Sequence, residues 1–239
     1  MKLLIIVPAY NEEKNIAGVI NNIKATNKTW DIAVINDGSK DKTAEVAEKT
    51  NSAFVITLPC NLGIGGAVQT GLKFAKRNNY DIALQFDGDG QHRADEITNL
   101  ISPILKKEVD VVIGSRFCGK NDGFKSTFTR RIGIKIFEIL NSILLHQKIT
   151  DNTSGFRAYN NKALSFLAEN YPTDYPEPEA VVLLKKNHFT IKEIHTEMLE
   201  RQGGTSSISG FKSAYYMIKV ILAILMTYMR PAVLKGDEK

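Results

Sequence analysis

The sequence contains little cysteine. Its 2 cysteines, Cys60 and Cys118, lie far apart in a chain of 239 residues and belong to no motif. A fold held together by disulfides is therefore excluded, and a reducing cytosolic environment is expected. The 4 histidines share no ligand spacing, so the sequence predicts no zinc site.

A strong charge of either sign is also absent. The formal net charge of +5 permits contact with an anionic surface, but no basic-aromatic pattern of nucleic-acid binding accompanies it. We therefore expect no nucleic-acid partner. The apolar run at residues 3–7 is too short for the hydrophobic core of a signal peptide and stops at Pro8. The remaining composition, 43% hydrophobic and 24% charged, is typical of an ordinary folded domain.

Short apolar runs alternate with helical patterns along the first half of the chain. The runs are typical of buried strands and cover residues 3–7, 32–35, 54–58, 82–86 and 109–113. Between them, apolar residues recur at helical spacing, as in residues 16–23. This alternation predicts an α/β fold with a mostly parallel central sheet flanked by helices.

Polar residues recur where these predicted strands end. Glu12, Asp37, Asp87, Asp89 and Arg116 each follow an apolar run. Because the carboxyl ends of parallel strands meet at one edge of a sheet, we expect these residues to converge there. That edge is where open α/β sheets bind ligands.

The segment Asp87-Gly88-Asp89-Gly90-Gln91 is the most informative of these strand ends. Two carboxylates and an amide at alternate positions offer oxygens to one hard cation, Mg²⁺ or Mn²⁺. Asp-Gly is equally a signal for a hairpin turn. The motif alone leaves both interpretations open.

The second half of the chain has a different pattern. Residues 127–147 carry a helical apolar stripe that begins next to Arg130 and Arg131. Its periodicity fits both a core-facing helix and a helix lying in a membrane interface. Residues 211–229 form a longer apolar helix interrupted by Lys219, and we expect it to contact a membrane surface or another subunit rather than to span a bilayer. Residues 235–239 form a polar tail.

Ordered motifs link these segments to a known family. They are Pro8-Ala9-Tyr10-Asn11-Glu12-Glu13, Asn36-Asp37-Gly38-Ser39, Asn61-Leu62-Gly63, Asp87-Gly88-Asp89, Gly114-Ser115-Arg116 and Thr153-Ser154-Gly155-Phe156-Arg157. Over residues 2–210 this order resembles the family-2 inverting glycosyltransferases of the GT-A fold, and most of all the dolichyl- and polyprenyl-phosphate sugar transferases. The resemblance implies a GT-A domain at 1–210, with a nucleotide-sugar half at 1–118 and an acceptor half at 119–210, followed by the C-terminal helix and tail at 211–239.

The same resemblance assigns roles on the donor side. Asp87, Asp89 and Gln91 look like the holders of the divalent cation, with Asp87 also facing the sugar or ribose. The residues that look like those around a UDP- or GDP-linked sugar are Pro8, Tyr10, Glu12, Asp37, Gly63 and Asp87. A nucleotide-sugar enzyme needs the cation because negative charge develops on the leaving diphosphate.

The acceptor is less clearly specified. Many relatives use the aspartate of a Glu-Asp pair as general base, and the matching position here is Glu179 in Glu177-Pro178-Glu179. A phosphate acceptor needs no base, since its second pKa is about 6 and it is already ionised. It needs cations instead, and the residues that resemble the family's phosphate-holding arginines are Arg116, Arg130 or Arg131, and Arg201.

These observations predict a metal-dependent transferase that uses a polyprenyl phosphate at the cytoplasmic face of the membrane, with Asp87, Asp89 and Arg116 at the reaction. One alternative is transfer to a saccharide hydroxyl, with Glu179 or Glu177 as base. A second is a non-catalytic scaffold in a polymer-assembly complex. Helix 211–230 would supply the membrane contact or the contact to a second copy of the chain.

Overall fold

A computed structural model describes residues 1–119, 142, 144, 147–199 and 211–233. The strands are β1 (Leu3–Ala9), β2 (Asp31–Asn36), β3 (Phe54–Thr57), β4 (Ile82–Gln85), β5 (Val111–Ser115), β6 (Arg157–Asn160) and β7 (Ile191–His195). The helices are α1 (Ile16–Thr26), α2 (Thr43–Lys49), α3 (Gly63–Arg77), α4 (Ile97–Leu105), α6 (Asn161–Asn170), α7 (Pro176–Lys186) and α8 (Phe211–Met229), with a short 3₁₀ turn η1 (Ala94–Glu96) before α4.

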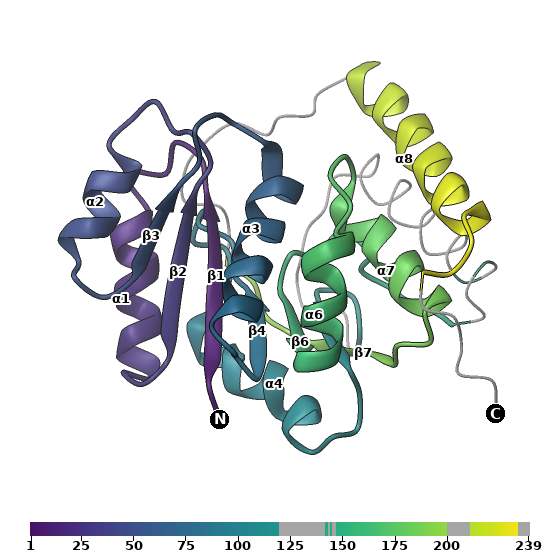
Figure 1. Cartoon of the computed structure of the whole chain (residues 1–239), viewed down its shortest axis with the longest axis horizontal. Helices are drawn as coiled ribbons and strands as arrows, with labels where there is room; N and C mark the ends of the chain where they lie inside the picture. The colour runs from purple at the N-terminus through teal and green to yellow at the C-terminus, as the bar shows by residue number, and fades with distance from the viewer. Residues whose placement is uncertain (120–141, 143, 145–146, 200–210, 234–239) are drawn as a thin grey trace.

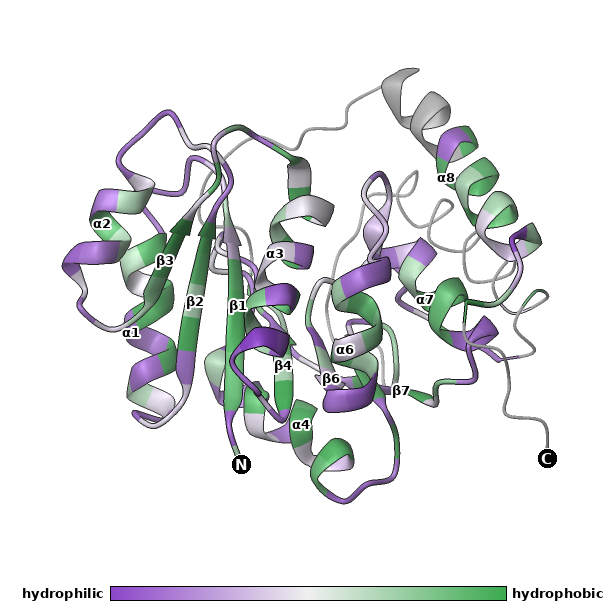
Figure 2. Ribbon diagram, in the orientation of Figure 1, coloured by the Kyte–Doolittle hydropathy of each residue, from purple (hydrophilic) through white to green (hydrophobic). Residues whose placement is uncertain are grey.

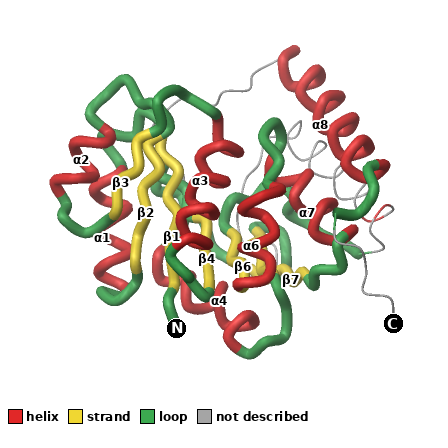
Figure 3. Tube along the Cα trace, in the orientation of Figure 1, coloured by secondary structure: helices red, strands yellow, loops and turns green. Residues whose placement is uncertain are grey.

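The strands form one sheet in the order β3-β2-β1-β4-β6-β5-β7. The pairs β3–β2, β2–β1, β1–β4 and β5–β7 are parallel, whereas β6 runs antiparallel to both β4 and β5. The predicted α/β fold with a mostly parallel sheet is therefore confirmed. Figure 3 shows the strands side by side between layers of helix.

Alternation along the strands sends side chains to two separate cores. Leu4 and Ile6 of β1 pack on one face with α3, α6 and α7, while Ile5 and Val7 pack on the other with α1, α2 and α4. Both faces of β1 are buried, which explains why its sequence is apolar at every position rather than at alternate ones. Figure 1 shows α3 and α6 together in front of the strands, and Figure 2 shows β1, β2 and β3 hydrophobic through most of their length.

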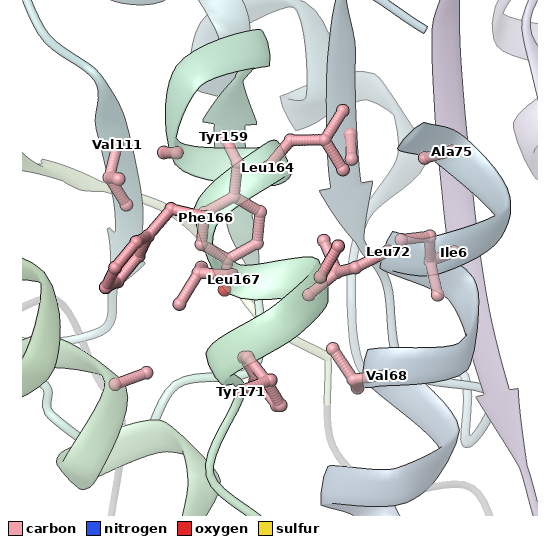
Figure 4. Close-up of a cluster of buried hydrophobic side chains, with 14 of the residues drawn as sticks. Ile6, Val68, Leu72, Ala75, Val111, Tyr159, Leu164, Phe166, Leu167 and Tyr171 are labelled. Carbon is pink, nitrogen blue, oxygen red and sulfur yellow. The ribbon is translucent and has the colours of Figure 1, made fainter. Parts of the chain in front are cut away.

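The contact between α3 and the sheet is unusually close. A Cβ atom at Gly71 of α3 would lie 2.3 Å from Cγ2 of Ile6, so a side chain there would push the helix off β1. Leu72 lies between α3 and α6 (Figure 4), and both Leu72 and Leu167 of α6 are completely buried. Truncating either leucine to alanine is expected to cost about 2–5 kcal/mol, because the void would not fully collapse.

The second half of the chain completes the sheet instead of forming a separate layer. Strands β6 and β7 were not expected from sequence, since each is short and β7 is largely polar on one side. The sheet is continuous across the predicted boundary at 118/119, which stays a prediction. Most of the predicted interfacial helix at 127–147 lies outside the described residues, as do Arg130, Arg131 and Arg201.

Helix α8 packs on α7 at the side of the molecule (Figure 1). Its inner face places Val220 and Ile224 against Val182 of α7. Its outer face leaves four apolar side chains exposed in a row, Ile218 (59%), Leu222 (54%), Met226 (58%) and Met229 (82%). We call these four residues the α8 stripe. Within the described part of the chain, no helix is both long and apolar enough to cross a bilayer.

Candidate active site

The predicted site residues lie at the carboxyl ends of β1, β2, β4 and β5, as the strand pattern indicated. Strand order reverses between β1 and β4, because β2 and β3 follow on one side of β1 and β4 lies on its other side. In open α/β sheets such a switch point creates a crevice for ligands. Asp87 and Asp89 stand directly after β4 at this position.

Asp87 is surrounded by groups that fix its orientation. Its backbone N–H donates to Nδ1 of His92 at 3.0 Å, and one carboxylate oxygen, Oδ2, lies 3.5 Å from Nε2 of the same ring. The other oxygen, Oδ1, lies 3.5 Å from the Nε2 amide of Gln85. A Cβ atom at Gly155 would lie 2.7 and 2.8 Å from the two carboxylate oxygens, so the backbone of Gly155 borders the carboxylate closely.

The rest of the loop is tied down by backbone hydrogen bonds. Oδ1 of Asp89 accepts the N–H of Gln91 at 3.0 Å, a local turn typical of aspartate. The carbonyl of Gln91 accepts the N–H of Leu199 at 2.8 Å, and His92 forms an isolated bridge with Met198. The loop is thus pinned to the segment after β7. Among the described residues, no three His, Cys, Asp or Glu side chains converge as a complete metal cage.

Arg116, at the end of β5, forms a buried ion pair with Asp151. Its Nε and Nη2 donate to the two carboxylate oxygens, each at 2.7 Å, and Nη2 also donates to Thr153 Oγ1 at 3.0 Å. Burial works against the charged form, yet the hydrogen bonds and charge of Asp151 raise the pKa of Arg116. Glu193 accepts the N–H groups of Thr150 and Asp151, which holds the acidic partner in place. A bidentate pair of this kind is both strong and directional.

His92 lies close enough to the charged side chains of the site for them to affect its pKa. Burial lowers the pKa of His92, while the carboxylates of Asp87, Asp89 and Asp151 act to raise it and Arg116 acts to lower it. The structure therefore brings Asp87, Asp89 and Arg116 into one electrostatic neighbourhood, as their positions at strand ends predicted.

The residues assigned to the nucleotide have varied surroundings. Pro8 is buried within β1, and Tyr10 just beyond it is 42% exposed. Glu12 is half-buried and accepts from the side-chain amide of Asn15 at 2.7 Å. Asp37 is buried, and its two oxygens accept the N–H groups of Leu62 and Gly63 at 2.7 and 2.9 Å. Asp37 thereby stabilises the start of α3, whose first N–H groups need acceptors. Its contact with a nucleotide base stays a prediction.

Glu177 and Glu179 point to different surroundings although only one residue separates them. Glu179 accepts the N–H of Tyr175 at 3.1 Å and the hydroxyl of Thr227 in α8 at 3.0 Å. The Glu177 carboxylate instead lies near Gln85, where the positive charge of Arg157 acts to lower its pKa and the negative charge of Asp87 acts to raise it. Burial raises the pKa of both glutamates. Glu177, rather than Glu179, is therefore the member of the pair beside Asp87.

A completely buried arginine joins the site to α7. Arg157 donates from Nε to the carbonyl of Ser154 at 2.7 Å, and from its two Nη atoms to the carbonyls of Asn152 and Glu177, each at 2.9 Å. Three carbonyl partners satisfy a guanidinium that would otherwise be costly to bury. The loop before β6 and the first turn of α7 are thus fixed relative to each other.

Sequence reasoning missed several of these positioning groups. Gln85 reads as part of an apolar strand, and Gly155 was noted only as a member of a motif. Arg157 carries no motif signal that separates a buried guanidinium from a ligand-binding one. Their importance depends on β6 lying beside β4, and that pairing was not foreseen. Glu177 could have been weighed equally with Glu179, since both stand in the same helical turn.

The chain is similar over most of its length to enzymes that transfer sugars. The profile of glycosyl transferase family 2 matches residues 4–167. The UDP-N-acetylglucosamine–dolichyl-phosphate N-acetylglucosaminyltransferase of Methanococcus voltae is 34% identical over 240 residues, covering 90% of this chain and 94% of that one. The polyprenol monophosphomannose synthase of Mycolicibacterium smegmatis is 26% identical over 227 residues, covering 92% and 85%.

The fold also resembles that of a solved structure. Glucosyl-3-phosphoglycerate synthase from Mycobacterium tuberculosis, in complex with Mn²⁺, UDP and phosphoglyceric acid, superposes with a TM-score of 0.72 at 19% identity, covering 97% of this chain and 80% of that one. This likeness concerns the fold and confirms the predicted GT-A architecture. Since the family profile spans more than half of the sequence, the chain belongs to glycosyl transferase family 2 and is a glycosyltransferase.

Proposed function

We propose that this protein is a metal-dependent, inverting glycosyltransferase that moves a sugar from UDP or GDP to a polyprenyl phosphate at the cytoplasmic face of the membrane. The observation that supports this most is the position of Asp87 and Asp89 directly after β4, beside the switch point of the sheet. Relatives named for transfer to dolichyl or polyprenyl carriers extend over about nine tenths of the chain, at 90% and 92% coverage.

On the donor side, the oxygens of Asp87, Asp89 and Gln91 suit Mg²⁺ or Mn²⁺. Such ions are hard, and they commonly take one or two carboxylates together with water and substrate phosphates. When bound, the cation would offset the negative charge that develops on the leaving nucleoside diphosphate. The chain's own task is to keep the carboxylates in place. Gln85 approaches the carboxylate of Asp87, and Asp89 accepts the N–H of Gln91.

The base and ribose would lie along the strand ends next to this pair. Tyr10 is exposed enough to contact a ring, and Pro8 and Glu12 flank it in sequence. Asp37 and Gly63 are hydrogen-bonded to each other at the start of α3, so the helix N-terminus and its aspartate would border the nucleotide together.

On the acceptor side, the geometry favours a phosphate. Both oxygens of Glu179 accept hydrogen bonds from groups on the α7–α8 side, so this residue is poorly placed to take a proton from a hydroxyl. A phosphate monoester arrives ionised and requires positive charge instead. Arg116 supplies one cation at the end of β5, positioned by Asp151. Arg130 or Arg131, and Arg201, would supply more.

Transfer to a saccharide hydroxyl is the second candidate, and one observation favours it. Glu177 lies near Gln85 and Asp87, and burial raises the pKa of its carboxyl group. A carboxylate with a raised pKa is a suitable general base. Glu177→Gln separates the two candidates, because it would abolish transfer to a hydroxyl and leave transfer to a phosphate largely intact.

A membrane-bound acceptor would explain the α8 stripe. Its exposed apolar residues lie on the side of α8 opposite to α7, where lipid could cover them. Vesicle flotation of Leu222→Ser/Met226→Ser tests this contact. Leu105→Ser, which removes an equally exposed leucine from the far end of α4, is the control (46% against 54% for Leu222). Loss of flotation in the double variant alone supports membrane docking, whereas equal flotation contradicts it.

The activity itself is tested with purified protein, Mn²⁺ and radiolabelled UDP- and GDP-sugars, with and without undecaprenyl phosphate. Label in the organic phase that requires both lipid and metal would support the proposal and identify the donor. Label transferred to an added oligosaccharide, or nucleotide release without lipid-soluble product, would favour the hydroxyl acceptor. Organic-phase label that persists in EDTA would refute the metal requirement.

A further inference from the structure

His92 is a buried polar residue that the proposed chemistry leaves without a role. It is only 6% exposed and comes one residue after Gln91, at the end of the Asp87–Gln91 loop. Its imidazole stacks on Phe156 with centroids 4.8 Å apart and meets Phe86 edge-on at 5.3 Å. These two rings leave the imidazole little freedom to rotate. A histidine buried for packing alone would be replaceable by a third aromatic ring.

The two nitrogens of the imidazole both face Asp87. Nδ1 accepts the backbone N–H of Asp87 at 3.0 Å, so Nδ1 carries no proton. The proton must then be on Nε2, because a neutral imidazole has one donor and one acceptor nitrogen. Nε2 lies 3.5 Å from Oδ2 of Asp87. One ring therefore accepts from the main chain of Asp87 and keeps its Nε2–H at ion-pair distance, longer than a normal hydrogen bond, from the side chain of the same residue.

The remaining contacts of Asp87 make this arrangement restrictive. Gln85 approaches the other oxygen, Oδ1, at 3.5 Å, and the backbone of Gly155 leaves no space on a third side. The Asp87 carboxylate can therefore adopt few orientations. His92 contacts both the backbone N–H and the carboxylate of Asp87. Partners of this kind orient carboxylates that bind metals and raise their affinity.

We propose that His92 is a positioning residue, which fixes the Asp87 carboxylate for the divalent cation of the donor complex through its Nε2–H. The inference rests on the proposed function, since it gives Asp87 the role of metal ligand. It assigns to His92 no contact with the sugar, the nucleotide or the acceptor.

The test compares three substitutions of His92 by their affinity for Mn²⁺, measured by electron paramagnetic resonance in the presence of UDP. His92→Phe keeps an aromatic ring against Phe86 and Phe156 but removes both nitrogens. His92→Gln places an amide N–H near the position of Nε2, and His92→Asn places an amide oxygen near that of Nδ1. His188→Asn is the matched control, because His188 has a left-handed backbone (φ 61°) that asparagine tolerates, and it lies in the turn after α7.

We expect His92→Phe to weaken Mn²⁺ binding by about 10–100-fold, the usual effect of removing such a partner. The KM for Mn²⁺ should rise more than kcat falls, and thermal unfolding should stay close to that of the wild type. His92→Gln should recover more affinity than His92→Asn, because the N–H toward the carboxylate is the contact that matters.

Two results would overturn the inference while leaving the proposed function in place. One is wild-type Mn²⁺ affinity in His92→Phe. The other is an affinity for His92→Asn equal to or above that of His92→Gln, which decides the question even if His92→Phe does not fold. Failure of the wild-type protein itself to bind Mn²⁺ with UDP would instead refute the metal site of the proposed function.

Discussion

Replacement of Gly155 by alanine tests whether the position of Asp87 controls the reaction. The added methyl would lie 2.7 and 2.8 Å from the carboxylate oxygens of Asp87 and 2.9 Å from Nε2 of Gln85. Carbon and oxygen atoms in contact normally stay about 3.3 Å apart or more. Asp87 must therefore retreat by roughly half an ångström, or β6 must shift away from β4.

Both responses have a measurable size. A misplacement of about 1 Å at a reacting centre can lower the rate by about 10²-fold, so a shift of half that size is expected to cost roughly 10-fold or more in kcat/KM. Overpacking a tight site typically costs about 1–3 kcal/mol of folding stability. For a chain of this size, each kcal/mol lowers the unfolding temperature by about 2–4 °C. The variant should thus remain folded at 25 °C and transfer sugar slowly.

Gly18→Ala provides the matched control. Gly18 lies inside α1, and a Cβ atom there would meet nothing within 4 Å. Alanine is the better helix former, so this variant should be more stable by about 0.5–1 kcal/mol with unchanged activity. The assay is metal-dependent sugar transfer combined with thermal unfolding of the same preparations. A folded Gly155→Ala protein with wild-type kcat/KM and wild-type Mn²⁺ affinity would refute the reasoning about Asp87.

Three further substitutions probe the charges around the site. Asp89→Ala should abolish turnover and leave the unfolding temperature nearly unchanged; surviving activity would contradict the metal assignment. Asp151→Ala should lower the free energy of unfolding by about 3–5 kcal/mol in denaturant titration, because it leaves the Arg116 guanidinium, whose side chain is only 10% exposed, without its carboxylate. Burial raises the pKa of Glu179 above 4.5, so the folded state holds this proton to higher pH than the unfolded state, and the residue lowers stability as pH rises through that window. Glu179→Gln should remove this loss, so that the stability of the variant relative to wild type increases with pH. A stability difference independent of pH would contradict the raised pKa of Glu179. Lost activity at full stability would contradict a role for Glu179 outside the proton transfer.

The first half of the fold could be predicted from sequence because its signals are local. Buried parallel strands such as β1 and β2 are apolar at nearly every position, and each is followed by polar residues at the edge of the sheet. That pattern located Asp37, Asp87 and Arg116 at the correct edge. No knowledge of distant contacts was needed.

The groups that orient these residues could not be predicted in the same way, because they depend on contacts between distant parts of the chain. Gly155 is important because its backbone borders the Asp87 carboxylate, and Asp151 because it forms an ion pair with Arg116. Both contacts require β6 to enter the sheet between β4 and β5. The sequence around β6, Arg157-Ala158-Tyr159-Asn160, is short and mixed in polarity, so it carries no strong strand signal. The choice between Glu177 and Glu179 likewise depends on α8, which lies far along the chain.

The antiparallel strand β6 also bears on the order in which this edge of the sheet can form. β4 and β5 pair with β6 on either side, as in Leu84 with Ala158 and Ile113 with Arg157. A nascent chain that has already completed β4 and β5 must therefore wait for residues near 160 before this part of the sheet can close. Pairings between residues so far apart in sequence are slow to form, because the loop between them must first be ordered. We therefore expect the edge that carries Asp87 and Arg116 to assemble late in folding.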